Sequence, residues 1–577
     1  MDVSAYLDVK PAPRAVFDRL EERRTRPRFM LPTDDGHWKS VTWGQFADQI
    51  RKCALYLDEL GIGRGDRAAI FAPNSIRWLS AAFGTQSTGA AFVPIYDSST
   101  GEQARYVVEH SGAKVVFADS QEILERIFSE WDAYEAVERV VVLGEEADPL
   151  EALASLHRQE GDAPNPAEVL SRLVDWSELE AIGASNHEMQ PGRFDDMLAG
   201  VTLEDTAFML YTSGTTGKPK GVPLTHENVG SNGRDWVEVN GPQIDEQAVD
   251  LCWLPFSHVF GFGEISLGNT LGFTTYLTNP GDVLDQLGEV RPSVFMSIPR
   301  YWEKIAQRAM QGETDEECGE LLEEVTGGRL QFCLSGGAGL KRQIKEFFRD
   351  HGYFITEGYG LTEASPTLTM NRPEEFRFDS VGKPFPSVEV KLADDGEILA
   401  KGPNIFEGYH ENPEATEEAF DEDGWLKTGD LGSWTEEGFL KIIGRKKEIL
   451  VTAGGKNIAP AHIEEKVDDD PLIEHLVVYG DGEKFLTAGI WVDEEAAAER
   501  LDGDKLSGDE HQRALRGVVE SRVEKLNEEL PSYETIKKFR VFQEPLSVEN
   551  GCLTPTMKVK RNEVYEKFGD ALDELYE

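Results

Sequence analysis

Residues 211–221 combine the residue types that bind phosphate groups. Their sequence is Tyr-Thr-Ser-Gly-Thr-Thr-Gly-Lys-Pro-Lys-Gly, and they follow the apolar run 207–210. Glycines let a backbone approach an anion closely, so several N–H groups of a loop after a strand can point at one phosphate. The hydroxyls and two lysines add donors and positive charge, which favours a polyphosphate over a single carboxylate. On these residues alone, a flexible surface loop remains the alternative.

The spacing differs from that of the Walker loop. A Walker loop has four residues between its glycines and a Ser or Thr after its lysine. Here only Thr215 and Thr216 separate Gly214 from Gly217, and Pro219 follows Lys218. A phosphoryl-transferring kinase that releases ADP is therefore the weakest of the functional alternatives.

Three later motifs place glycines or carboxylates where a nucleotide could bind. They are Ser-Gly-Gly-Ala-Gly at 335–339, Glu-Gly-Tyr-Gly-Leu-Thr-Glu at 357–363 and Trp-Leu-Lys-Thr-Gly-Asp at 425–430. Ligands commonly bind at the carboxyl ends of strands in α/β sheets, and a carboxylate readily accepts hydrogen bonds from ribose hydroxyls. Taken singly, Tyr359 could equally be a core aromatic, although glycines on both sides are not typical of an ordinary strand.

Two basic segments stand out in an acidic chain. Residues 441–456 contain five basic side chains opposed only by Glu448, and residues 558–561 read Lys-Val-Lys-Arg. Such local reversals of charge indicate anion sites. A solvated basic patch and a basic tail are the alternatives.

Together and in this order, the motifs resemble those of the adenylate-forming (AMP-binding) superfamily, and of its long-chain acyl-CoA synthetases in particular. The resemblance extends from about Val41 to the C-terminal lysines. It implies that Thr212 and Glu363 hold magnesium, that Tyr359 lies against the adenine, that Thr362 lies near the α-phosphate and that Asp430 binds the ribose. The full set of ATP-binding residues implied is Thr212, Ser213, Gly214, Thr215, Thr216, Gly217, Lys218, Gly337, Ala338, Gly358, Tyr359, Gly360, Thr362, Asp430 and Arg445.

The resemblance also assigns the acyl side, the hinge and the catalytic lysine. His258 and Phe262 would line the acyl pocket, with Phe262 at a position that is a gating tryptophan in some long-chain enzymes. On its own, a histidine at the end of an apolar strand is more often structural. Lys447 would be the hinge, and Lys558 would bridge the carboxylate and the α-phosphate. The loop that acts during thioester formation would contain Gly454, Gly455 and Lys456.

The expected reaction follows from this resemblance: ATP-dependent ligation of a long- or medium-chain fatty acid to coenzyme A through an acyl-adenylate, with release of AMP and pyrophosphate. Fixed positive charge and magnesium are needed because one anion attacks another. Catalysis would depend on Lys558, Glu363 and Thr212. The alternatives are an aryl or short-chain acid ligase, transfer to a carrier protein, and a non-catalytic acyl or nucleotide binder.

Composition limits the partners. The chain has 577 residues and a net charge of −48, which disfavours nucleic acid and allows at most peripheral contact with a membrane. The acid excess would suit concentrated salt. Five scattered cysteines, no secretory leader and no apolar run of 18 residues lead us to expect a protein of the reducing cytoplasm.

Alternating strand and helix patterns predict an α/β fold with parallel sheets. We expect a helix over 43–60 and strands over 67–71 and 91–95, then a single helix over 167–179 within an irregular surface connection at 145–200. The expected organisation is a large, multi-layered N-terminal body over 1–444 with a small β-rich subdomain, a hinge at 445–448, and a small mobile C-terminal α/β domain over 449–577.

Overall fold

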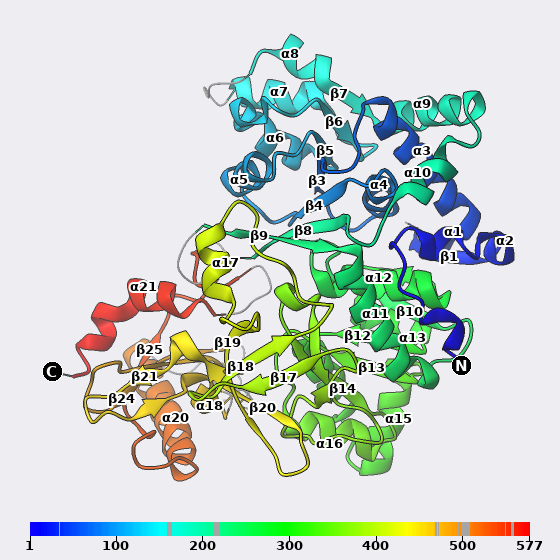
Figure 1. Cartoon of the computed structure of the whole chain (residues 1–577). Coiled ribbons are helices and arrows are strands. Elements are labelled where there is room, and N and C mark those ends of the chain that lie inside the picture. Colours follow the sequence, from blue (N-terminus) through cyan, green and yellow to red (C-terminus); the bar gives the residue numbers. More distant parts are fainter. Residues whose placement is uncertain are drawn as a thin grey trace. The chain divides into compact units, whose positions relative to one another are not determined.

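The computed structural model (Figure 1) describes most of the chain. The described residues are 1–33, 35–158, 164–212, 218–464, 466–467, 470, 472–493, 496–497, 508–547, 550–554 and 559–576. They form two compact units, of which unit 1 comprises 1–390 and 400–426 and unit 2 comprises 391–399 and 427–577. The predicted hinge at 445–448 concerns motion and stays a prediction.

Unit 1 contains a seven-stranded sheet in which all strands but the last run parallel. In spatial order the strands are β7 (Leu173–Asp175), β6 (Arg139–Val142), β5 (Val115–Ala118), β3 (Arg67–Phe71), β4 (Ala91–Ile95), β8 (Thr206–Thr212) and β9 (Lys220–Thr225). Successive residues of β3 enter different hydrophobic clusters, Ile70 on one face of the sheet and Phe71 on the other. The sheet is therefore buried on both faces, as parallel sheets normally are.

Helices on both faces of this sheet begin where the sequence supplies capping residues. Thr42 forms a capping box with Gln45 at the start of α3 (Trp43–Glu59), and Thr100 does so at the start of α5 (Gly101–Ser111). Side chains of α3 and of α4 (Ile76–Ser87) pack into one cluster, which contains Trp43 and Trp78. The predicted helix at 43–60 and strands at 67–71 and 91–95 are confirmed.

The connection at 145–200 differs from its prediction. In place of one helix over 167–179, the chain forms α8 (Pro166–Arg172), the edge strand β7, and α9 (Trp176–Met189). Val174 and Trp176 are buried, so this short interruption adds a strand to the sheet as well as covering it. A three-residue strand between two helices is too short to give a periodic pattern.

A nine-stranded sheet completes the core of unit 1. Its order is β16 (Lys383–Pro384), β15 (Thr367–Met370), β14 (Ile355–Gly360), β13 (Phe332–Ser335), β12 (Val294–Ser297), β10 (Val249–Cys252), β11 (Thr274–Leu277), β1 (Pro27–Pro32) and β2 (Trp38–Thr42). The central strands β14 to β1 run parallel, and the strands at each edge run antiparallel. Its helices include α12 (Val259–Leu271), α14 (Pro299–Ala309) and α16 (Arg342–Asp350).

Unit 2 has smaller sheets. One sheet has the order β17 (Glu389–Leu392), β18 (Glu397–Lys401), β19 (Leu426–Trp434) and β20 (Leu440–Arg445), which confirms the β-rich segment expected here. A three-stranded sheet follows, with β23 (Ile473–Tyr479), β24 (Leu486–Val492) and β25 (Ile536–Phe542), together with α18 (Pro460–Glu464), α20 (Gly508–Glu528) and α21 (Arg561–Asp573). Within the described residues, no helix is both long and apolar enough to cross a bilayer.

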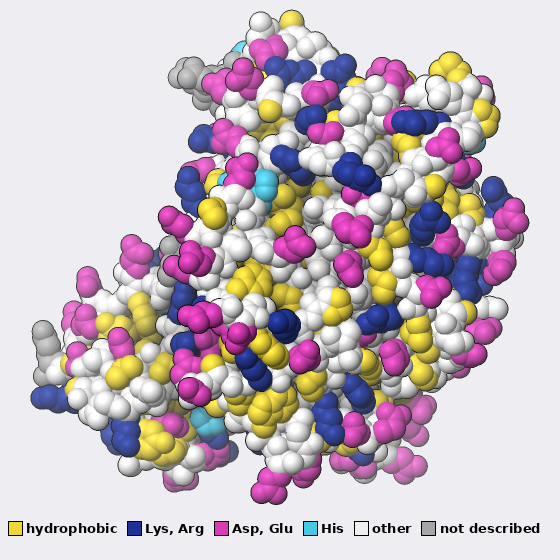
Figure 2. Space-filling view, viewed as in Figure 1, with side chains coloured by type: hydrophobic (Ala, Val, Ile, Leu, Met, Phe, Trp, Pro, Cys, Tyr) yellow, Lys and Arg dark blue, Asp and Glu magenta, His cyan; other side chains and the backbone are white. Residues whose placement is uncertain are grey.

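The charge of the chain is distributed over its surface. Figure 2 shows acidic side chains scattered across the face in view, with lysines and arginines between them. An excess of 106 acidic over 58 basic residues means that anionic ligands must be met by local groups of basic side chains.

Candidate functional site

The predicted phosphate loop connects two strands of a hairpin. Residues 213–217 lie outside the described residues, but both flanks are described: Thr212 ends β8 and pairs with Lys220 at the start of β9, and Tyr211 pairs with Gly221. A strand therefore follows the loop, where a Walker loop would lead into a helix. This agrees with the exclusion of Walker spacing.

Aromatic rings contact the two lysines that flank the loop. The Nζ of Lys218 lies 5.4 Å from the ring centroid of Tyr106, and the Nζ of Lys220 lies 4.6 Å from that of Tyr409. The Tyr106 hydroxyl also donates to the carbonyl of Pro219 at 2.9 Å. The ammonium groups are thus held over ring faces, which attract cations.

Two histidines brace the strand before the loop. The Nδ1 of His110 lies 2.9 Å from the Tyr211 hydroxyl, and His410 donates from Nε2 to the His110 carbonyl at 3.1 Å. Burial lowers the pKa of His410 and raises that of Tyr211. Both groups therefore stay neutral near pH 7.

Glu363 lies in a short 3-10 helix, η4 (Thr362–Ala364), directly after β14. Its Oε1 accepts a hydrogen bond of 2.8 Å from the Tyr409 hydroxyl, the one bond to this carboxylate within the described part of the chain. Burial, and then the nearby carboxylate, raise the pKa of Tyr409, so the phenol remains a donor. The second oxygen of Glu363 accepts no hydrogen bond within the described residues, and carboxylate oxygens are ligands that magnesium prefers.

A buried ion pair holds the glycine-rich turn at 336–339. Glu357, at 6 % exposure, accepts from the backbone N–H of Leu340 at 2.7 Å and pairs with the Nζ of Lys345 at 2.5 Å. Lys345 also donates to the Phe378 carbonyl at 2.7 Å. Glu357 therefore ties the predicted adenine turn, which contains Gly337 and Ala338, to the strand that carries Tyr359. Burial raises the pKa of Glu357, against the effect of Lys345.

Strand β14 is irregular, in keeping with the glycines on both sides of Tyr359. Gly358, Tyr359 and Gly360 pair with β15, and the register shifts between Tyr359 and Gly360. A Cβ on Gly360 would lie 1.7 Å from the Pro366 carbonyl oxygen, so the glycine permits close approach of the chain after η4.

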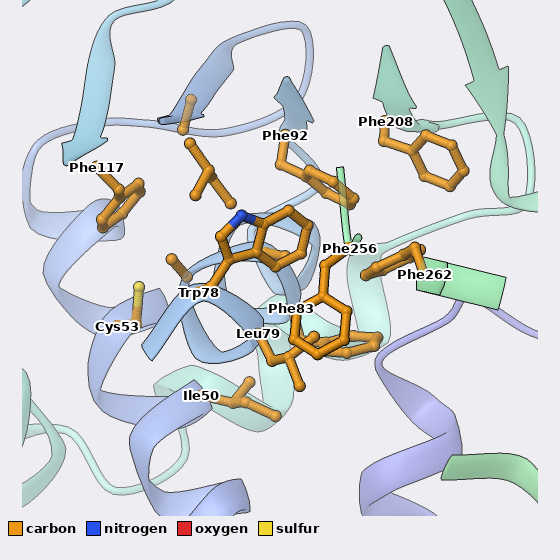
Figure 3. Close-up of a cluster of buried hydrophobic side chains, with 14 of the residues drawn as sticks. Ile50, Cys53, Trp78, Leu79, Phe83, Phe92, Phe117, Phe208, Phe256 and Phe262 are labelled. Atoms are coloured by element: carbon orange, nitrogen blue, oxygen red, sulfur yellow. The ribbon is translucent and has the colours of Figure 1, made fainter. Parts of the chain in front are cut away.

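The predicted acyl-pocket residues lie in the first turn of α12, where the sequence indicated a strand ending in a turn. His258 is the N-cap, and its Nδ1 accepts from the N–H of Phe260 at 3.1 Å. Phe262 is 4 % exposed and lies among other aromatic rings (Figure 3). The centroids nearest to its ring are those of Phe92 (4.9 Å), Phe83 (5.3 Å), Phe208 (5.4 Å) and Trp78 (6.0 Å).

Four glycines in or next to α12 differ in the space around them. A Cβ would lie 2.3 Å from the Pro255 carbonyl oxygen at Gly261, 2.8 Å from Arg28 at Gly268 and 2.9 Å from Arg23 at Gly272. These three glycines therefore serve tight packing. Gly263 meets nothing within 4 Å and is the one of the four that borders open space.

In unit 2, Asp430 and Arg445 face each other across the β19–β20 hairpin. Arg445 donates from Nε to Oδ1 of Asp430 at 2.9 Å, with side chains 53 % and 7 % exposed. Gly429, next to Asp430, has φ +73°, a conformation that favours glycine. The structure therefore brings these two predicted nucleotide ligands together.

The basic segment 441–456 of unit 2 has more acidic partners than its sequence suggested. Lys446, in η5 (Lys446–Glu448), pairs with Asp395 at 2.6 Å and Glu397 at 2.7 Å. Lys447 beside it is exposed. The charge balance was not visible locally because the two acids are about 50 residues away in sequence.

The loop at 452–456 is a closed turn between two short strands, β21 (Leu450–Val451) and β22 (Asn457–Ile458). Thr452 N–H donates to the Lys456 carbonyl at 3.0 Å, and Gly455 N–H to that of Thr452 at 2.8 Å. Gly454 and Gly455 are exposed, and the Nζ of Lys456 lies 5.6 Å from the Tyr533 ring centroid.

The predicted catalytic Lys558 lies outside the described residues, but its flanks are fixed. Leu553 and Val559 form an isolated bridge, and Arg561 makes two bonds of 2.6 Å to Glu464. The Glu464 charge raises the pKa of Arg561 despite burial, so the guanidinium stays charged.

Comparisons of the sequence with known proteins all point to one family. The profile of AMP-binding enzymes matches residues 17–410, and that of the AMP-binding enzyme C-terminal domain matches 447–577. The chain is 34 % identical to the long-chain-fatty-acid–CoA ligase FadD15 of Mycobacterium bovis, over 96 % of each chain. It is 30 % identical to the peroxisomal long chain acyl-CoA synthetase 6 of Arabidopsis thaliana, over 97 % of this chain and 85 % of the relative.

Solved structures agree on the fold. The adenylation domain of the carboxylate reductase from Mycobacterium chelonae superposes with a TM-score of 0.81 at 23 % identity, covering 100 % of this chain and 92 % of that one. At this identity the likeness supports the architecture, with its α/β body and its smaller C-terminal part, and does not extend to a substrate.

Proposed function

Because the chain belongs to the family of AMP-binding enzymes, we propose that it is an ATP-dependent ligase that joins a long- or medium-chain fatty acid to coenzyme A through an acyl-adenylate. The observation that supports this most directly is end-to-end similarity, over 96 % of each chain, to a relative named as a long-chain-fatty-acid–CoA ligase. The site geometry adds a phosphate-loop hairpin flanked by two lysines and a carboxylate bonded to Tyr409.

In the first half-reaction the fatty acid carboxylate attacks the α-phosphorus of ATP and pyrophosphate leaves. The loop at 212–218 binds the leaving phosphates, and Lys558 neutralises the attacking oxygen and the transferred phosphoryl group. Thr212 and Glu363 would hold the magnesium ion that accompanies ATP, and the ion would supply positive charge to the phosphate oxygens. Fixed positive charge lowers the barrier because negative charge accumulates on the phosphoryl oxygens.

Residues of a turn, a strand, a short 3-10 helix and a hairpin bind the adenosine and its α-phosphate. The turn at 336–339 and Tyr359 flank the adenine, Thr362 lies near the α-phosphate, and Asp430 with Arg445 binds the ribose. Asp430 is almost fully buried and anionic beside Arg445, which makes it a strong acceptor for hydroxyl groups.

In the second half-reaction the thiol of coenzyme A attacks the acyl carbonyl and AMP leaves. The loop with Gly454, Gly455 and Lys456 serves this step, and the chain rotates about Lys447 between the steps so that Lys558 withdraws from the path of the thiol. The hinge at 445–448 then separates a body over 1–444 from a mobile domain over 449–577, and hinge motion contributes to the turnover rate.

The acyl group lies against His258 and α12. The enzyme works in the cytoplasm, in keeping with five free thiols and no disulfide. Its substrates are ATP, a fatty acid and coenzyme A, and contact with a membrane is at most peripheral.

The test is a product assay across acids and salt concentrations. Protein with magnesium and ATP is incubated with acetate, octanoate, palmitate or benzoate, and pyrophosphate and AMP are measured with and without coenzyme A. We expect acyl-CoA and AMP with octanoate and palmitate. Activity confined to acetate or benzoate contradicts the chain-length proposal, pyrophosphate without transfer to coenzyme A indicates another acceptor, and absence of AMP with every acid contradicts the ligase.

A further inference from the structure

Residues 406–410, here called the strap, connect the phosphate-loop hairpin to Glu363. At one end the backbone N–H of Phe406 donates to the Glu363 carbonyl at 2.9 Å, and at the other the N–H of His410 donates to the Gly221 carbonyl at 2.9 Å. The strap is therefore bonded to the strand after the loop and to the helix that carries the carboxylate. Both ends belong to unit 1.

The strap is fixed in place by packing. Phe406 is 2 % exposed, and its ring packs against Tyr409 and Phe420 at centroid distances of 4.9 and 5.7 Å. The N–H of Tyr409 donates to the hydroxyl of Thr416 in α17 (Pro413–Ala419) at 2.9 Å. A Cβ on Gly221 would lie 3.1 Å from that of His410, so the glycine allows β9 and the strap to lie close together.

Tyr409 makes two contacts that differ in chemistry. Its hydroxyl donates to Oε1 of Glu363 at 2.8 Å, and its ring face lies 4.6 Å from the Nζ of Lys220. A cation over the ring draws electron density from the phenol, which strengthens the hydroxyl as a donor to an anion. One oxygen of Glu363 is thereby oriented, and the other accepts no hydrogen bond within the part of the chain that the structure describes.

We propose that Tyr409 is a positioning residue that sets the distance between the positive charge on the phosphate loop and the magnesium-binding carboxylate. This inference rests on the proposed function, in which Glu363 holds magnesium. In this proposal Tyr409 acts through its contacts with Glu363 and Lys220. The expected consequence of its loss is a weaker hold on the metal–nucleotide complex with little effect on the acid.

The test compares Tyr409→Phe with Tyr106→Phe. Tyr409→Phe removes only the bond to Glu363 and keeps the ring beneath Lys220. Tyr106→Phe removes a hydrogen bond to the same hairpin, at Pro219, and leaves Glu363 untouched. Binding of Mn²⁺ is measured by paramagnetic resonance in the presence of α,β-methylene-ATP, and the magnesium dependence of pyrophosphate release is measured separately.

We expect Tyr409→Phe to weaken Mn²⁺ binding by about 10- to 100-fold, the range for one hydrogen bond to a charged group, with an unchanged KM for the fatty acid. Tyr106→Phe should leave Mn²⁺ binding within about twofold of the wild type, since its bond does not reach a charged group. Equal effects of the two substitutions on Mn²⁺ binding overturn the proposal, as does a Tyr409→Phe enzyme whose metal requirement matches the wild type.

A third variant keeps the test decisive if Tyr409→Phe does not fold. Lys220→Met removes the cation from the face of the Tyr409 ring. It should weaken Mn²⁺ binding about two- to fivefold, as expected for a partly exposed cation–π contact. No change in Mn²⁺ binding overturns the coupling. The binding assay needs no turnover, so if the wild type forms no AMP the ligase proposal fails by itself; a wild type that does not bind Mn²⁺ with the analogue overturns the inference on Tyr409.

Discussion

Replacing Asp430 with asparagine tests the assignment of the ribose site. The carboxylate is 7 % exposed and paired with Arg445 at 2.9 Å, and it has the charge and burial of a strong acceptor. Asparagine keeps the shape of the side chain and removes the negative charge. A hydrogen bond to a charged group contributes about 1.5–3 kcal/mol, whereas a neutral one contributes about 0.5–1.5 kcal/mol.

The difference between these values sets the expected effect. Loss of about 1–2 kcal/mol per ribose hydroxyl raises the KM for ATP by roughly 5- to 30-fold for each hydroxyl bound. The fold should tolerate the change, because the Arg445 side chain is 53 % exposed and pairs of this kind contribute at most about 1 kcal/mol. The variant should therefore be folded at the temperature of the assay.

The assay compares ATP with 2′-deoxy-ATP and 3′-deoxy-ATP in pyrophosphate release. The wild type should discriminate against at least one analogue, and Asp430→Asn should lose most of that discrimination, because the partner of the missing hydroxyl is already weakened. Asp395→Asn is the control for the loss of one carboxylate in the same unit: it breaks a pair with Lys446 in which the Asp395 side chain is 52 % exposed. Retention of full sugar discrimination by Asp430→Asn would refute the assignment.

Three further predictions follow from separate features of the chain. Phe262→Ala should cost about 3–5 kcal/mol of unfolding free energy and shift the acid profile towards longer chains; an unchanged profile in the chain-length assay contradicts the pocket assignment. Lys558→Ala should abolish most acyl-adenylate formation, measured as acid-dependent pyrophosphate release, and an undiminished rate contradicts its role. Burial raises the pKa of Glu264 well above its ordinary value near 4.5, so the stability this group contributes is complete below that value and is lost as pH rises through the raised pKa. Glu264→Gln should therefore flatten the fall in Tm as the pH rises above about 4.5, and parallel Tm curves for the two proteins count against it.

The sequence alone predicts the elements that depend on residues close together in the chain. The apolar run before the glycine and threonine motif was predicted to be a strand, and it forms β8. Periodicity located α3 to within a residue because one face of the helix is continuously apolar and Thr42 supplies its cap. These features depend on neighbours in sequence, so a single chain suffices to predict them.

Contacts between distant residues could not be predicted in this way. Tyr409 reaches Glu363 from 46 positions away, and Glu357 meets the Leu340 N–H from 17 positions away. Neither tyrosine nor glutamate has a local pattern that names its partner, because the partner is set by how strands and helices pack. The helical environment of Phe262 was also missed, since its run of glycines and aromatics gives no amphipathic period.

Both ends of α12, the helix that we propose lines the acyl site, are held by hydrogen bonds. His258 caps the first turn, and arginines from the N-terminal segment bond to carbonyls of the last turns. These bonds are from Arg28 to Ile265 (3.1 Å), from Arg23 to Asn269 (3.0 Å) and Thr270 (3.3 Å), and from Arg26 to Gly272 (3.2 Å).

Carbonyls at a helix end have no partner within the helix, and buried ones must be satisfied elsewhere. Burial lowers the pKa of Arg28 to about 10, which still leaves it charged and able to donate at neutral pH. Moving α12 as a body would break several charge-assisted bonds at once. If α12 lines the acyl site as proposed, different chain lengths must be met by side chains of its first turn, near Phe262 and Gly263, rather than by displacement of the helix.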